Sequence, residues 1–302
     1  MSVAAAPAAV PASTASVLPY AGTIFLSAFL LFLVQPIIAK QILPWFGGSA
    51  AVWTTCLVFF QSVLLAGYAY ADVTHRLGLR RQTWLHLTLL AISLATLPIL
   101  AAESWKPAGD EQPIARILLL LAATIGLPYF LLSTTTPLLQ AWYVRRFHAA
   151  VPYRLFALSN FASLLALLGF PVLFEPWFTL PQLGWGWSAM YGVFVLICTA
   201  TAVISLRAAD GGEPRVQPPP VSPAEGVAPS LALQLRWLAL AAMGSVMLLA
   251  VTNHVTQNVA SVPFLWVLPL SLYLLSFILC FDSDRWYRRE LWAPATTMLK
   301  VR

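Results

Sequence analysis

Charged residues are scarce in this chain, and their scarcity excludes most classes of soluble protein. Only 9% of the 302 residues are charged, whereas a soluble domain carries about a quarter. Hydrophobic residues make up 60% of the chain, and the mean hydropathy is +0.79. This composition predicts an all-α polytopic membrane protein, because a helix satisfies its own backbone hydrogen bonds in lipid.

Acids, histidines and cysteines, which build most metal and catalytic sites, are also few. The chain has 11 Asp and Glu, four His and three Cys, and Cys56, Cys198 and Cys280 stand far apart. Their spacing argues against a disulfide scaffold and against a cysteine zinc site. No Gly-x-Gly-x-x-Gly follows a strand-like run. We therefore expect no metal site, no cofactor and no catalytic residue in this chain.

Long apolar runs are plentiful, and about 20 such residues as a helix cross the roughly 30 Å of hydrocarbon in a bilayer. Eight runs qualify, so we predict about eight transmembrane helices. They cover residues 20–39, 50–71, 83–102, 114–139, 155–174, 185–206, 237–262 and 264–281. The seventh run is the least regular, because its last part contains the polar stretch 252–258. That stretch either belongs to the span or begins an outer loop.

The basic residues follow the positive-inside rule when the amino terminus is placed inside. Of the 17 Lys and Arg residues, only Lys40, Lys106 and Arg116 then fall at the outer side. We expect a multi-pass protein of the bacterial inner (plasma) membrane with both termini in the cytoplasm. Because topology accounts for the net charge of +6, we expect the lipid bilayer as a partner and no nucleic acid.

The spans and the loops between them divide the chain into five segments. We expect a disordered cytoplasmic tail, a six-helix membrane unit, a cytoplasmic Pro-rich linker, two further membrane helices and a cytoplasmic basic tail. The corresponding ranges are 1–19, 20–207, 208–236, 237–282 and 283–302. This layout is that of the major facilitator superfamily, with one six-helix half and the first two helices of a second half.

The loop after the second span carries a motif similar to one in that superfamily. Gly67 and Asp72 are followed by Arg76-Leu-Gly-Leu-Arg80-Arg81, with extra residues between Asp72 and Arg76. The eighth span runs into a comparable series at the corresponding place, which comprises Asp284, Arg288 and Arg289. The two loops therefore predict an internal repeat.

Several segments resemble one family more closely. These are FLSAFLLFLVQP (25–36), LPWFGG (43–48) and ALSNFASLLALL (157–168). They resemble the membrane part of the bacterial fused major-facilitator and spermidine-synthase-like proteins. In that family the membrane helices precede a cytosolic domain similar to polyamine aminopropyltransferases. The resemblance thus implies a polyamine-synthase-like domain as partner, and we expect that domain to be absent from this chain.

Polar residues within the apolar runs are candidates for a substrate path. Gln35, beside Pro36, either stabilises a helix kink or faces a central cavity. Lys40 either extends to the interface or turns into the cavity. Polar residues at membrane depth usually face a bundle interior, and the densest group comprises Asn253, His254, Gln257 and Asn258.

Charged residues of the two inner loops form a second set of candidates. We expect Asp72 with Arg76, Arg80 and Arg81, and Asp284 with Arg288 and Arg289, to form inner-face charge networks. Such networks either gate a conformational change or only set the topology.

Three functions are compatible with these features. The first is a membrane module that anchors a polyamine-synthase-like domain or exchanges a small molecule with it. The second is a secondary transporter of a small neutral or anionic solute. The third is an aminopropyltransferase-related membrane protein. Transport of a polyamine itself is disfavoured, because no Asp or Glu lies inside the core of a predicted span.

Overall fold

The computed structural model describes residues 14–47, 49–107, 113–147, 153–210, 229–258, 267–283 and residue 286. Within these ranges the protein is helical and has no strand. The α-helices are α1 (Thr14–Phe46), α2 (Ala50–His75), α3 (Leu79–Ser93), α4 (Pro113–Leu121), α5 (Leu127–Phe147), α6 (Tyr153–Gly169), α7 (Leu180–Asp210), α8 (Leu231–Asn258) and α9 (Val267–Asp282). The prediction of a helical membrane protein is confirmed.

The structure has fewer helices of spanning length than the sequence predicts. Six described helical segments are long and apolar enough to cross a membrane. They are Val17–Phe46, Ala51–His75, Pro113–Phe147, Tyr153–Phe174, Leu180–Arg207 and Leu231–Thr252. The other two predicted spans correspond to α3 and α9, which have 15 and 16 residues. At about 1.5 Å per residue these helices fall short of the hydrocarbon thickness.

The prediction that residues 83–102 form one spanning helix is wrong for the outer half of that range. The helix ends at Ser93, a short 3-10 turn covers Leu94–Thr96, and Leu97 is extended with φ −85° and ψ 150°. The cause is Pro98, because a residue that precedes a proline avoids the helical region and the proline itself has no N–H to donate.

Two other prolines are accommodated without ending a helix. A π-helical turn, Ala122–Gly126, joins α4 to α5 just before Pro128, and a second one, Phe170–Phe174, contains Pro171 and extends α6. Such turns absorb the hydrogen bond that a proline cannot make. Residues 113–147 therefore form one continuous helical segment.

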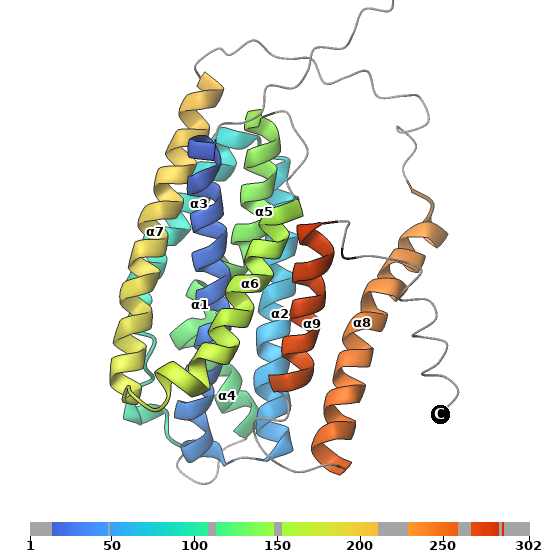
Figure 1. The fold of residues 1–302 in the computed structure, drawn as a ribbon. Helices are drawn as coiled ribbons and strands as arrows, with labels where there is room; N and C mark the ends of the chain where they lie inside the picture. Colours follow the sequence, from blue (N-terminus) through green and yellow to red (C-terminus); the bar gives the residue numbers. More distant parts are fainter. Residues whose placement is uncertain are drawn as a thin grey trace, which may run out of the picture.

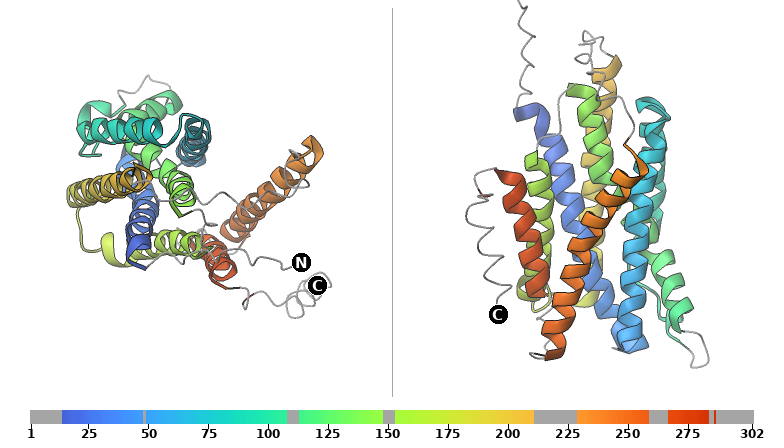
Figure 2. Two further views of the ribbon diagram at one scale, coloured as in Figure 1. Left: turned by 90° about the horizontal axis from the view of Figure 1, so that it is seen from above. Right: turned by 90° about the vertical axis from the view of Figure 1, so that its right-hand side faces the viewer.

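The helix α1 lies at the centre of the bundle. It packs against α5, α6 and α7, while α2 packs on α4 and α5, and α3 on α5 and α7 (Figure 1). The helix α9 lies along α6, and α8 contacts α9 but stands apart from the rest of the bundle (Figure 2). Helices α1–α7 therefore form a unit to which α8 and α9 are attached at one side.

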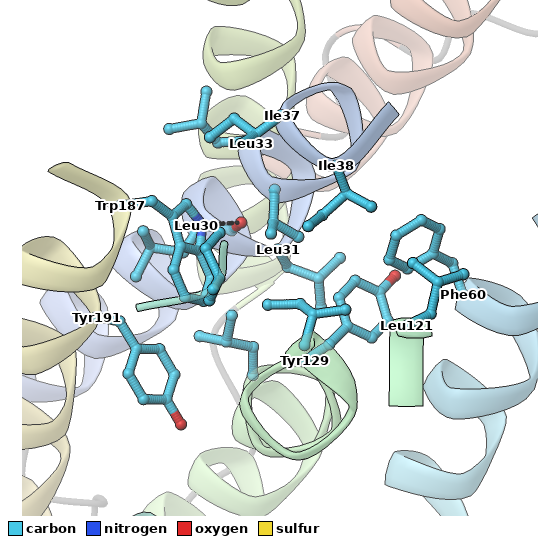
Figure 3. Packing of buried hydrophobic residues seen from close by; sticks show 14 of the residues in the cluster. Leu30, Leu31, Leu33, Ile37, Ile38, Phe60, Leu121, Tyr129, Trp187 and Tyr191 are labelled. Atoms are coloured by element: carbon cyan, nitrogen blue, oxygen red, sulfur yellow. Dashed lines mark hydrogen bonds between the residues drawn. The ribbon is translucent and has the colours of Figure 1, made fainter. Parts of the chain in front are cut away.

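The centre of this unit is filled by large apolar side chains. Ile37 and Ile38 of α1 belong to the same buried cluster as Phe60 of α2 and Tyr129 of α5. Figure 3 shows these side chains together with those of Leu30, Leu31, Leu33, Leu121, Trp187 and Tyr191. The indole Nε1 of Trp187 donates to the carbonyl oxygen of Leu30 at 3.0 Å, which ties α7 to the middle of α1.

Gly67 is required where α2 crosses α5. A Cβ built on Gly67 would lie 2.9 Å from the Cβ and 3.2 Å from the carbonyl carbon of Ser133. These atoms cannot move without a shift of the α5 backbone. Close approach of helix backbones at small residues is typical of packing in membranes.

Replacing Gly67 by alanine is expected to destabilise the protein by roughly 1–3 kcal/mol, because the added methyl group forces α2 and α5 apart. The measurement is thermal unfolding of the purified protein in detergent. Gly192→Ala in α7 is the control, since a Cβ there meets no atom within 4 Å. Equal melting temperatures for the two variants would contradict the close contact.

Candidate functional site

Lys40 lies at the wall of a cavity at one end of the bundle. The cavity has a volume of about 330 Å³, and its polar lining residues are Lys40, Gln41 and Glu103. The Nζ atom of Lys40 is 3.7 Å from Oε1 of Glu175, and both side chains are partly exposed. The structure therefore places Lys40 in an ion pair beside a cavity at this end of the bundle, and both alternatives for Lys40 stay predictions.

The other two basic residues predicted for the outer side gather at the same end. Lys106 pairs with Glu103 at 3.0 Å, and its Nζ atom lies 5.7 Å from the ring centroid of Trp45. The guanidinium of Arg116 lies 5.5 Å from the ring centroid of Trp105. Such cation–π contacts hold the charges close to the ring faces. This end of the bundle thus combines three cations with two carboxylates, which pair with Lys40 and Lys106.

Gln41, which the sequence analysis did not single out, supports the wall of this cavity. Its side chain is buried. Its Nε2 donates to the carbonyl oxygen of Ala101 at 3.0 Å, and its Oε1 accepts from the Ala101 N–H at 3.3 Å. These two bonds satisfy the backbone of the segment that follows Pro98, where helical hydrogen bonds are lost.

Gln35 does not line the cavity around Lys40. It is half-buried, and its Nε2 donates to the carbonyl oxygen of Leu31 in the same helix at 3.4 Å. This contact stays within α1 and does not reach the carbonyl oxygen of Phe32, which Pro36 leaves without its helical partner, so the role of Gln35 stays a prediction.

The polar stretch 252–258 is helical, because α8 continues to Asn258. It does not begin an outer loop after Val251. The side chain of His254 is exposed, and the side chains of Asn253, Gln257 and Asn258 lie outside the described part of the structure. None of the residues that line the cavity around Lys40 comes from α8. The structure therefore does not bring the two predicted parts of the substrate path to one site.

The predicted charge network at the end of α2 is not formed through ion pairs in the described residues. Asp72, Arg76, Arg80 and Arg81 are all exposed, and no ion pair joins Asp72 to any of the three arginines. The turn depends instead on Gly78, whose φ of 78° and ψ of 159° are readily accessible only to glycine. Asp284, Arg288 and Arg289 lie outside the described residues.

A buried network next to this loop is centred on Gln82 of α3, which is fully buried. Its Nε2 donates to Oγ1 of Thr74 at 3.0 Å, and its Oε1 accepts from Nε1 of Trp142 at 3.3 Å and from Nη1 of Arg145 at 3.1 Å. Arg145 also donates to the carbonyl oxygen of His75 at 2.9 Å. This network joins α2, α3 and α5 through one amide. The sequence signal for it is the pair Gln82 and His86, two polar residues one helical turn apart in an apolar helix.

No group of three or more His, Cys, Asp or Glu side chains that could hold a metal ion occurs among the described residues. Comparison of the chain with protein-family models, with curated proteins and with solved structures finds no match. The geometry of the molecule is therefore the basis for its functional assignment.

Proposed function

We propose that the chain is a membrane module similar to the transmembrane part of the spermidine-synthase-like fusion proteins. In this proposal it anchors a polyamine-synthase-like partner domain or exchanges a small molecule with it. The observation that carries the proposal is the contrast between α8 and the unit formed by α1–α7.

The helix α8 has almost no partner in the described protein. Its apolar window within Leu231–Thr252 has a mean hydropathy of 1.7, and none of that window is buried. By comparison, 56% of the corresponding window in α1 is buried. The unit α1–α7 buries its own core, whereas α8 contacts only α9 closely and leaves its apolar window exposed. This contrast supports a protein that works together with further membrane helices or domains.

The last turns of α8 strengthen this inference. They follow the apolar span Leu231–Thr252 directly and contain Asn253, His254, Gln257 and Asn258. A long apolar helix that continues into a polar end is compatible with contact to other helices or to a partner domain. In the major-facilitator layout, α8 and α9 are the first helices of a second half, and the other helices of that half would contact α8.

A cysteine on α8 is expected to cross-link to a partner protein in native membranes. Val246 of α8 is 60% exposed, and Val246→Cys, made with Cys280→Ser, carries the cross-linker. We expect products that contain a polyamine-synthase-like domain or its membrane segments, identified by mass spectrometry.

The matched control is Val193→Cys in the same background. Val193 is 49% exposed and lies on α7, at the opposite side of the bundle from α8 (Figure 1). The membrane-module proposal is contradicted if both variants cross-link to the same set of proteins and no synthase-like product is specific to the α8 variant.

A secondary transporter of a small neutral or anionic solute is the second candidate function. It is favoured by the cavity beside Lys40, where a cation paired at 3.7 Å with the partly exposed Glu175 can exchange that partner for a solute carboxylate. The packed apolar centre of the bundle (Figure 3) requires a change of conformation for any passage, as in alternating access.

Uptake into proteoliposomes tests the transporter. If the cavity binds the transported solute, Lys40→Ala is expected to reduce uptake of a labelled amino acid or organic anion at least tenfold. Lys40→Arg keeps the charge and is expected to retain most of the activity. The contrary result is uptake of amino acid, organic anion and spermidine by the folded protein that is no greater than by empty liposomes. That result contradicts the transporter function and leaves the membrane-module function as the proposal.

We also infer that the protein lies in the bacterial inner membrane, with the turn between α2 and α3 and the first turn of α3 in the cytoplasm. The distribution of basic residues between the two ends of the bundle supports this orientation. In intact spheroplasts, a membrane-impermeant maleimide is expected to label Lys106→Cys. It is expected to label Arg80→Cys only after lysis, and the reverse pattern contradicts the orientation. Both native side chains are exposed, so neither site is hidden within the protein.

A further inference from the structure

A group of buried polar atoms between α2, α3 and α5 has no hydrogen-bond partner among the described residues. It comprises Oη of Tyr70, Oγ1 of Thr83, and both Nδ1 and Nε2 of His86. Thr83 and His86 are fully buried. An unsatisfied buried donor or acceptor costs about 1–3 kcal/mol, so four of them in one place are a substantial burden on the fold.

These side chains belong to one site. The ring of His86 has its centroid 6.1 Å from that of Tyr70 and meets the ring of Trp142 edge-on at 6.2 Å. Thr83 precedes His86 by three residues on α3, which places both side chains on the same face of the helix. Tyr70 in turn packs against Phe130 of α5 at 5.4 Å. Aromatic rings from α2 and α5 therefore surround the polar atoms.

The neighbouring polar groups are already engaged. Gln82 lies one turn before His86, and its oxygen accepts from both Trp142 and Arg145 while its nitrogen donates to Thr74. Neither ring nitrogen of His86 takes part in these hydrogen bonds.

The surroundings select a small neutral ligand. Asp72, the carboxylate of α2, is exposed, and the charged group bound to the adjacent Gln82 is the cation Arg145, which disfavours a second positive charge nearby. A neutral imidazole has one donor and one acceptor nitrogen, and each hydroxyl can donate and accept. A water molecule supplies two donors and two acceptors, and it typically makes about three hydrogen bonds when buried.

We propose that Tyr70, Thr83 and His86 form an internal water-binding site between α2, α3 and α5. The bound water bridges the imidazole of His86 to the hydroxyl of Tyr70, in place of a direct hydrogen bond between these two side chains. The site lies on the α3 face that carries the Gln82 network, so a continuous row of polar side chains extends from Arg145 into the bundle. It is independent of the module and transporter functions proposed above.

Water contact at His86 is directly measurable because the chain has only four histidines. In protein labelled with ¹⁵N-histidine and reconstituted in bilayers, His86 is assigned by the loss of its signal in His86→Asn. Water-edited solid-state NMR is expected to transfer magnetisation from water to a His86 ring in its neutral form. His75, which is exposed at the end of α2, is the positive control. Transfer to His75 but none to His86 overturns the proposal.

A double-mutant cycle provides a second test that does not depend on the NMR signal. In the native background, Tyr70→Phe is expected to raise the equilibrium constant of unfolding about fivefold, in line with one lost hydrogen bond. The same change is expected to have less than about a twofold effect when His86 is already phenylalanine, because the bridging water is then lost.

Tyr68→Phe is the matched control for this cycle. Tyr68 is on the same helix and is 50% exposed, so its effect is expected to be the same with or without His86→Phe. The proposal is wrong if Tyr70→Phe is neutral or stabilising in the native background, or if its effect is unchanged by His86→Phe. In either case no water bridges the two side chains.

Discussion

Bulk water does not reach the interior of a bilayer, so each buried hydroxyl, amide or ring nitrogen of this protein needs a partner within the bundle. The contacts between α1 and α7 illustrate the rule. Tyr20 and Ser205 hydroxyls lie 2.6 Å apart, those of Thr23 and Thr201 lie 3.1 Å apart, and the Trp187 indole donates to the backbone of α1. Because apolar attraction between helices is weak in lipid, such bonds and close packing determine which helices meet.

The same rule explains why the two ends of the bundle differ. Near the N-terminal end of α3, Gln82 accepts hydrogen bonds from two side chains of α5 and donates one to a side chain of α2. At the other end α3 stops early, and Gln41 satisfies the backbone of Ala101 where helical bonds have ended. That interruption leaves room for the cavity beside Lys40. A single proline in the third apolar run thus shapes the end of the bundle that contains this cavity.

The helices α8 and α9 differ in how they are attached to the rest of the bundle. The helix α9 is held to α6 by aromatic contacts, in which the ring of Phe281 lies 5.4 Å from Phe156 and stacks at 6.3 Å on Tyr153. The helix α8 stands apart from the bundle (Figure 2), and its large apolar side chains are exposed. A tightly packed unit with an exposed helix at one side is an arrangement that further helices or a partner domain can complete.

The sequence by itself determined the class of protein and the position of most helices, because the cost of moving side chains into lipid depends on composition and run length alone. It could not determine which polar residues meet. Gln35 and Gln41 are six residues apart on α1, yet one bonds within its helix and the other supports a distant segment, because the helical twist points them in different directions. Lys40 of α1 pairs with Glu175 at the end of the neighbouring α6 segment, and Gln82 is buried although it follows two exposed arginines. These outcomes depend on how the helices are packed around α1, and that packing is a property of the tertiary structure.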